Sequence, residues 1–132
     1  MMLAGNLFDT IDLENGLKIQ VWDLSRKLAG GRWLVSLEIR IDIPLMIENL
    51  QVVPEKEKAF SVLRTEYGDR ILYTHKLEKH FVEMNRKEKV FGKFMEIVRK
   101  DILQYLSHPD FANKFTMSTY KKFKTQNPQL FM

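Results

Sequence analysis

Lysines are interleaved with aromatic side chains near the C-terminus, and these residue types could bind phosphates and bases. The segment contains Lys114, Phe115, Tyr120, Lys121, Lys122, Phe123 and Lys124. Lysine ammonium groups attract phosphates, and exposed aromatic rings stack on bases, so such a mixture is typical of nucleic-acid-binding surfaces. The candidate nucleic-acid-binding residues are Lys114, Tyr120, Lys121, Lys122 and Lys124.

The same segment also has a simpler interpretation. A helix with Thr116 as its N-cap and an end near Thr125 would place Tyr120 and Phe123 on one face. Aromatic residues at helical spacing are usually core residues, and the lysines would then only be solvated. This interpretation is favoured over nucleic-acid binding.

The three histidines do not predict a metal site. His75 and His80 are five residues apart, whereas two ligands on one helix face are three or four residues apart. His80 and Glu83 have the right spacing, but two ligands do not make a site. His108 stands alone. We therefore expect no metal and no cofactor.

Nucleophilic catalysis has no local support in the sequence. No serine lies in a G-x-S-x-G turn, and the chain has no cysteine. The pair Gly30-Gly31 lacks the Gly-Lys-Ser/Thr that completes a phosphate-binding loop. Two carboxylates that meet only in space would leave no sequence pattern. An enzyme is therefore the least supported class of protein.

The net charge of +4 is concentrated in the last third of the chain. Residues 1–53 contain 5 basic and 7 acidic side chains, and residues 54–85 contain 6 of each. Residues 86–132 contain 10 basic and 4 acidic side chains. The basic character therefore belongs to one part of the fold rather than to the whole chain.

Length and composition predict one globular domain. The chain has 132 residues, of which 45% are hydrophobic and 29% charged. Its N-terminus lacks a signal-peptide pattern, and no stretch of about 20 apolar residues could span a bilayer. We expect a single domain over residues 1–132, strand-rich over 1–43 and helix-rich over 54–125, in the cytoplasm and without a membrane partner.

Alternating apolar and polar residues predict strands in the first 43 residues. The clearest strand covers residues 32–43, and Pro44 would end it. The same alternation predicts a second strand over residues 16–23 and a shorter third strand over residues 8–13. One face of the strand over residues 32–43 is entirely apolar: Trp33, Val35, Leu37, Ile39, Ile41 and Ile43.

The pair Gly30-Gly31 predicts a hairpin turn between the two longer strands. A two-residue loop there would place Val21 beside Arg40, which pairs a core position with a charged one. Either a bulge near residues 23–25 or a short helical turn between the strands would correct this register.

After Pro54 the pattern favours helices. Pro54 suits a first helical position, and Gly68 suits the residue that follows a last turn. The alternative is a hairpin around Gly68-Asp69, with strands over residues 59–67 and 70–77. A helix over residues 54–67 would bury Ala59, Phe60, Leu63 and Tyr67.

Apolar residues then recur at alternating steps of three and four, which is typical of one side of a helix. Between Lys87 and Leu106 the pattern favours helix, and His108-Pro109 would end it. This apolar seam would cover the sheet or be shared with a second copy of the chain. Its members are Leu77, Phe81, Met84, Phe91, Met95, Val98, Ile102 and Tyr105.

Together these patterns predict an α+β fold, in which a small antiparallel sheet from an N-terminal hairpin or meander packs against C-terminal helices. The favoured function is a non-enzymatic binding or interaction module that forms a homo-oligomer, such as a homodimer, or has a protein partner. The alternative is a nucleic-acid-binding protein that uses the basic C-terminal third.

Overall fold

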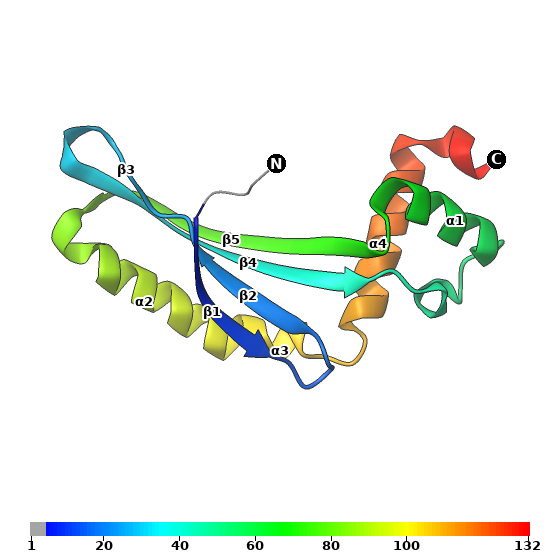
Figure 1. Cartoon of the computed structure of the whole chain (residues 1–132), viewed down its shortest axis with the longest axis horizontal. Coiled ribbons are helices and arrows are strands. Elements are labelled where there is room, and N and C mark those ends of the chain that lie inside the picture. Colours follow the sequence, from blue (N-terminus) through cyan, green and yellow to red (C-terminus); the bar gives the residue numbers. More distant parts are fainter. Residues whose placement is uncertain (1–4) are drawn as a thin grey trace. The chain divides into compact units, whose positions relative to one another are not determined.

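A computed structural model describes residues 5–132 and has the α+β architecture that the sequence predicts (Figure 1). The chain divides into two compact units. One holds residues up to Ile41 together with Thr74–His108, and the other holds Asp42–Tyr73 and Pro109–Met132. The expectation of a single domain stays a prediction.

The strands are β1 (Asn6–Asp12), β2 (Lys18–Asp23), β3 (Arg26–Lys27), β4 (Arg32–Pro44) and β5 (Arg70–Glu83). The helices are α1 (Lys56–Tyr67), α2 (Lys87–Ile97), α3 (Leu103–Leu106) and α4 (Phe111–Gln126).

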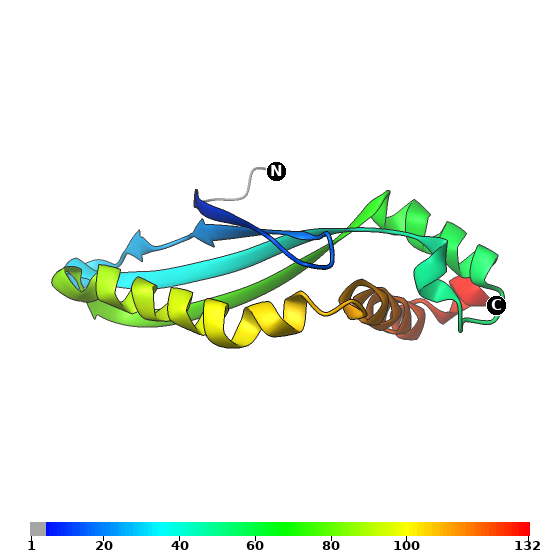
Figure 2. The same cartoon turned by 90° about the horizontal axis from the view of Figure 1, so that it is seen from below.

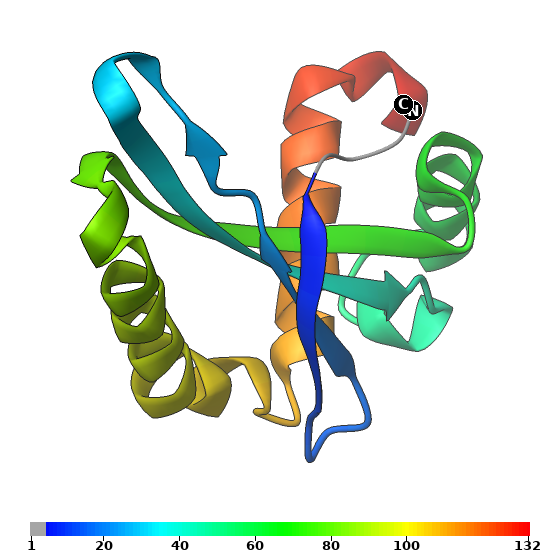
Figure 3. The same cartoon turned by 60° about the vertical axis from the view of Figure 1, so that its left-hand side comes forward.

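In the first unit, the sheet is built around β4. β1 pairs with β2, and β2 and β3 pair with successive parts of β4 in antiparallel register. β5 also pairs with β4. Figure 3 shows the tight turn that joins β1 to β2. The three N-terminal strands predicted from alternation are confirmed, with boundaries that differ by a few residues.

The hairpin register is set by a three-residue turn, Ala29–Gly31, rather than by a bulge. Gly30 and Gly31 have φ angles of 72° and 73°, a region that glycine occupies at little cost. The third loop residue shifts the register by one position, so that Val21 lies opposite Ile39. Apolar residues are thereby brought together on one face of the sheet.

The apolar face of β4 is buried from Val35 to Ile43, as its alternation predicts, and Leu37, Ile39 and Ile41 are 0% exposed. The other face is more covered than the alternation suggests. There the Arg40 guanidinium lies 4.4 Å from the ring centroid of Trp22 and pairs with the Glu38 carboxylate. This packing buries a charged side chain together with its partner.

β5 (residues 70–83) shows that the apolar seam was wrongly read as helical at its start, because Leu77 and Phe81 lie in a strand. The structure combines the two alternatives for residues 59–77, with helix α1 followed by a strand. Phe81 has a φ of 57°, a left-handed conformation that is uncommon outside glycine. Phe81 is exposed, whereas Val82 next to it is buried.

From Lys87 to Leu106 the chain is helical, as predicted, through α2, a π-helical turn at Val98–Ile102 and α3. These helices follow one face of the first unit's sheet (Figure 2). The apolar seam is buried from Phe91 to Val98, but Tyr105 is exposed. The Asn15 side chain ties the β1–β2 turn to the end of α3, since its Nδ2 donates to the Leu106 carbonyl oxygen at 2.8 Å.

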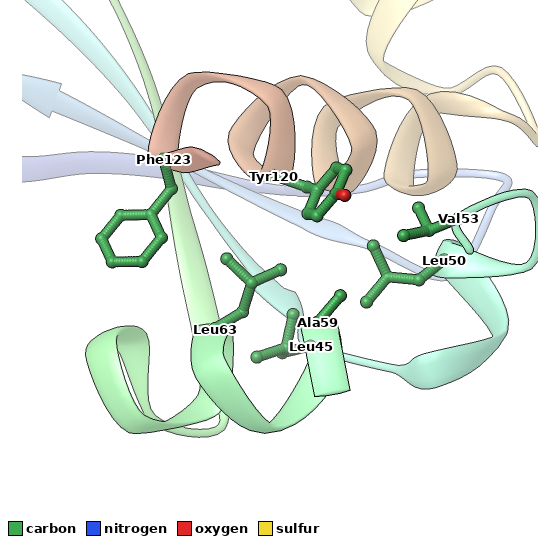
Figure 4. Packing of buried hydrophobic residues seen from close by; sticks show 7 residues of the cluster. All are labelled: Leu45, Leu50, Val53, Ala59, Leu63, Tyr120 and Phe123. Atoms are coloured by element: carbon green, nitrogen blue, oxygen red, sulfur yellow. The ribbon is translucent and has the colours of Figure 1, made fainter. Parts of the chain in front are cut away.

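The second unit has a hydrophobic cluster of its own, formed by α1, α4 and the segment that follows β4 (Figure 4). The helix predicted over residues 54–67 is confirmed as α1, and it buries Ala59 and Leu63. Tyr67, which was expected in the core, is instead 41% exposed. The cluster consists of Leu45, Leu50, Val53, Ala59, Leu63, Tyr120 and Phe123.

The last helix begins earlier than predicted. α4 starts at Phe111, so Thr116 is an internal, fully buried residue and not an N-cap. The Thr116 hydroxyl donates to the carbonyl oxygen of Ala112 at 2.8 Å, which satisfies it inside the helix. Within residues 5–132, no helix combines the length and the apolar character needed to cross a bilayer.

Candidate nucleic-acid interface

α4 has two chemically different faces. Its inner face carries the buried side chains of Phe111, Thr116, Tyr120 and Phe123. Asn127 follows the last turn, and its Nδ2 donates to the Phe123 carbonyl oxygen at 3.1 Å. Pro128 comes next and cannot continue the helical hydrogen bonds. The amphipathic pattern thus fixes which side chains of α4 face solvent.

The outer face of α4 lines a groove of about 730 Å³. Lys114, Ser118, Lys121 and Thr125 follow one another at steps of four, three and four residues, so they form one stripe along the helix. Exposed Val52 also contributes to the groove. The remaining lining residues are Asn113, Met117, Lys122 and Gln126.

The groove is positively charged because its three lysines have no acidic partner. Among the described residues, Lys114, Lys121 and Lys122 form no ion pair. From Phe111 to Met132 the sequence contains four lysines and no aspartate or glutamate. Unpaired ammonium groups on one helix face attract anions, most strongly a chain of phosphates at low salt.

A second hollow with an aromatic lining adjoins the groove. Ser118 and Lys122 line both, so the two hollows are neighbours on the surface. Tyr67 and Phe115 supply aromatic rings to this second hollow. Burial, with a smaller contribution from the charge of neighbouring Glu66, raises the pKa of Tyr67. Tyr67 is therefore a neutral phenol at neutral pH, with a ring that is partly open to solvent.

The structure separates the five candidate residues predicted from the sequence. Lys114, Lys121 and Lys122 line the groove. Tyr120 is only 8% exposed and packs edge-on against Phe131, with ring centroids 5.5 Å apart. Tyr120 is therefore left out of the proposed surface. Lys124 lies outside the groove, with its Nζ 5.7 Å from the centroid of the Tyr120 ring.

Sequence reasoning missed Tyr67 as a surface residue. Its position four residues after buried Leu63 indicates the inner face of α1. Tyr67 is, however, the last residue of that helix, and Gly68 turns the chain away with a φ of 79°. A helix end next to a glycine was the only available signal that the ring could be half exposed.

The histidines stay apart from any candidate site. His75 and His80 are exposed on β5, and His108 is exposed after α3. No three His, Cys, Asp or Glu side chains of residues 5–132 are grouped so that they could hold a metal ion.

Comparisons with models of protein families, with curated proteins and with solved structures found no match. Support for the candidate interface therefore comes only from the residues that line it and from their charges.

Proposed function

We propose that this chain is a non-enzymatic binding module whose second unit binds single-stranded nucleic acid. The observation that carries the proposal is that two hollows share Ser118 and Lys122 as lining residues: one is lined by Lys114, Lys121 and Lys122, the other by Tyr67 and Phe115. Single-strand binders combine a basic groove for the backbone with aromatic rings for the bases. Both features occur side by side on this unit.

Each part of the surface has a distinct role in this proposal. The three lysines attract backbone phosphates without regard to sequence, since each is a mobile point charge. The Tyr67 ring offers a face for one base, which is available in a single strand but not inside a duplex. We therefore expect a preference for single strands and little dependence on base sequence.

The test uses the full-length chain and a fluorescein-labelled oligothymidylate of twenty nucleotides, followed by fluorescence anisotropy at low salt. A Lys114→Gln, Lys121→Gln, Lys122→Gln variant is expected to bind at least about 10-fold more weakly. The matched control is Lys27→Gln, Lys79→Gln, Lys89→Gln, which removes the same charge from exposed positions outside both hollows. Equal weakening by both triple variants, or no binding by the wild-type chain, would contradict the proposal.

Stacking is tested separately at Tyr67. Tyr67→Phe keeps the ring and is expected to keep the affinity, while Tyr67→Leu removes the π face. A stacked base contributes about 1–3 kcal/mol, so Tyr67→Leu should weaken binding by roughly 5-fold or more. If both variants bind like the wild type, Tyr67 does not contact bases.

Self-association and a cytoplasmic location stay predictions from the sequence. Light scattering over a range of concentrations tests the first. A chain that is monomeric at every concentration would contradict the expected homo-oligomer. That result would not affect the proposals of nucleic-acid binding or of a different protein partner.

A further inference from the structure

The first unit contains a cleft of about 820 Å³, a size common for small-molecule sites. Aromatic rings from three different elements line it: Phe8 of β1, Trp33 of β4 and Phe91 of α2. Phe8 and Phe91 meet edge-on with centroids 4.8 Å apart, yet Phe8 remains 53% exposed. The cleft therefore offers an aromatic surface that the chain itself leaves partly uncovered.

Gly92 is one of the residues that line this cleft. It lies in the middle of α2, where glycine is less favourable than alanine. Its backbone has no left-handed φ that would require glycine, and a Cβ built there meets no atom within 4 Å. Neither packing nor backbone conformation in the described chain explains this glycine. The space beside it would accept a larger side chain, which would stand at the wall of the cleft.

Polar groups at the cleft point to an anionic ligand. Trp33 lines the cleft, but its indole Nε1 is itself buried and so is not open to a ligand there. Arg99 also lines it and has no carboxylate partner within residues 5–132. Lys87 is already placed over the Trp33 ring, 3.8 Å from its centroid.

The cleft also contains two carboxylates, which limits the charge that it can accept. Asp23 uses its Oδ1 to accept a hydrogen bond from the Ser25 backbone N–H at 2.9 Å, and Glu88 lies in the first turn of α2. Two cations and two carboxylates leave the lining without net charge. A ligand with several negative charges therefore fits less well than one with a single anionic group.

We infer that this cleft binds a flat aromatic molecule with one acidic group. The ring system packs among Phe8, Trp33 and Phe91 over the gap at Gly92, and the acidic group pairs with Arg99. The acidic group is a carboxylate or a phosphate, because both accept hydrogen bonds from a guanidinium. This site belongs to the first unit and does not depend on the function proposed for the second.

The experiment is a calorimetric titration of the full-length chain with two probes that share one ring system, 2-naphthoate and 2-naphthyl phosphate. Binding of at least one probe is expected, and the stronger one identifies the acidic group. Gly92→Leu places a side chain in the cleft and is expected to remove binding. Gly92→Ala should raise the melting temperature by a few degrees, because alanine favours the helix, and weaken binding less.

Arg99→Gln keeps the inference testable if Gly92→Leu fails to fold, since Arg99 is exposed. We expect this variant to bind the anionic probes at least about 5-fold more weakly. A loss of this size is in the range of one charge-assisted hydrogen bond. The uncharged analogue 2-naphthamide should bind the wild type and Arg99→Gln equally. The inference is overturned if neither anionic probe binds, or if a folded Gly92→Leu variant binds like the wild type.

Discussion

The ring of Tyr67, at the end of α1, packs edge-on against Phe123 of α4, with centroids 5.8 Å apart and an interplanar angle of 66°. Phe123 belongs to the hydrophobic cluster of the second unit, while Tyr67 is partly exposed and lines the aromatic hollow. One side of the phenol therefore contributes to the core and the other remains accessible. This contact links the stability of the unit to its candidate binding surface.

Tyr67 should make the chain less stable at high pH. Burial, and secondarily the charge of Glu66, raises its pKa above the ordinary value of 10.0. Above about pH 10 the unfolded chain loses this proton before the folded chain does, so the free energy of unfolding falls as pH rises through the folded-state pKa. Urea denaturation of the wild type and Tyr67→Phe between pH 8 and 11 measures the difference. The two curves should diverge above about pH 10, and parallel curves would argue against the shifted pKa.

Removing the Leu63 side chain should destabilise the second unit. Leu63 is 0% exposed inside the cluster, so Leu63→Ala leaves a cavity and is expected to cost about 2–5 kcal/mol. Val52 is the control, because its side chain is 81% exposed and Val52→Ala should change stability by less than about 0.5 kcal/mol. Chemical denaturation measures both. A cost below about 1 kcal/mol for Leu63→Ala would show that the cluster is not tightly packed.

Asn15 should stabilise the first unit through its amide donors. Its Nδ2 donates to the carbonyl oxygens of Leu106 and His108 at 2.8 and 3.0 Å. Asn15→Ala removes these two hydrogen bonds and also the one that its Oδ1 accepts, and it is expected to cost about 1–3 kcal/mol. Asn15→Asp keeps the Oδ1 acceptor for the Leu17 backbone N–H but loses both donations, so it should cost a similar amount. An Asn15→Asp variant as stable as the wild type would exclude this role.

Glu38 should contribute to the stability of the fold, because the charged side chain of Arg40 is buried beside it. The side chains of Arg40 and Glu38 are 7% and 13% exposed, and Lys76 approaches the same carboxylate at 3.7 Å. Glu38→Leu leaves the Arg40 charge without its partner, at an expected cost of about 3–5 kcal/mol. The double variant Glu38→Leu, Arg40→Met removes both charges and should recover most of that loss. If the double variant is less stable than Glu38→Leu alone, the account of this pair is wrong.

Alternation predicted β4 correctly because one of its faces is apolar over its whole length, from Trp33 to Ile43. β5 was predicted less well, because few of its side chains are buried. Leu77 and Phe81 happen to continue the helical spacing of Phe91 and Met95, so a strand and a helix share one apolar pattern. A pattern of apolar spacing alone does not show where the period changes.

The candidate interface could be predicted only in part. Lysines close together on one helix, such as Lys114 and Lys121, are visible in the sequence, and so is the aromatic face that carries Tyr120. The adjoining hollow depends on α1 and α4 packing together, which brings Tyr67 close to Phe115 although they are far apart in sequence. Tertiary packing of this kind leaves no periodic signal.

The salt dependence of binding is the strongest test of the proposed nucleic-acid groove, because it would report how many phosphates the lysines neutralise. We expect the logarithm of the association constant for single-stranded oligothymidylate to fall linearly with the logarithm of salt concentration. Three phosphate contacts correspond to a slope of roughly −2, and replacing Lys114, Lys121 and Lys122 by glutamine should remove most of it. A triple variant with the same slope as the wild type would contradict the account.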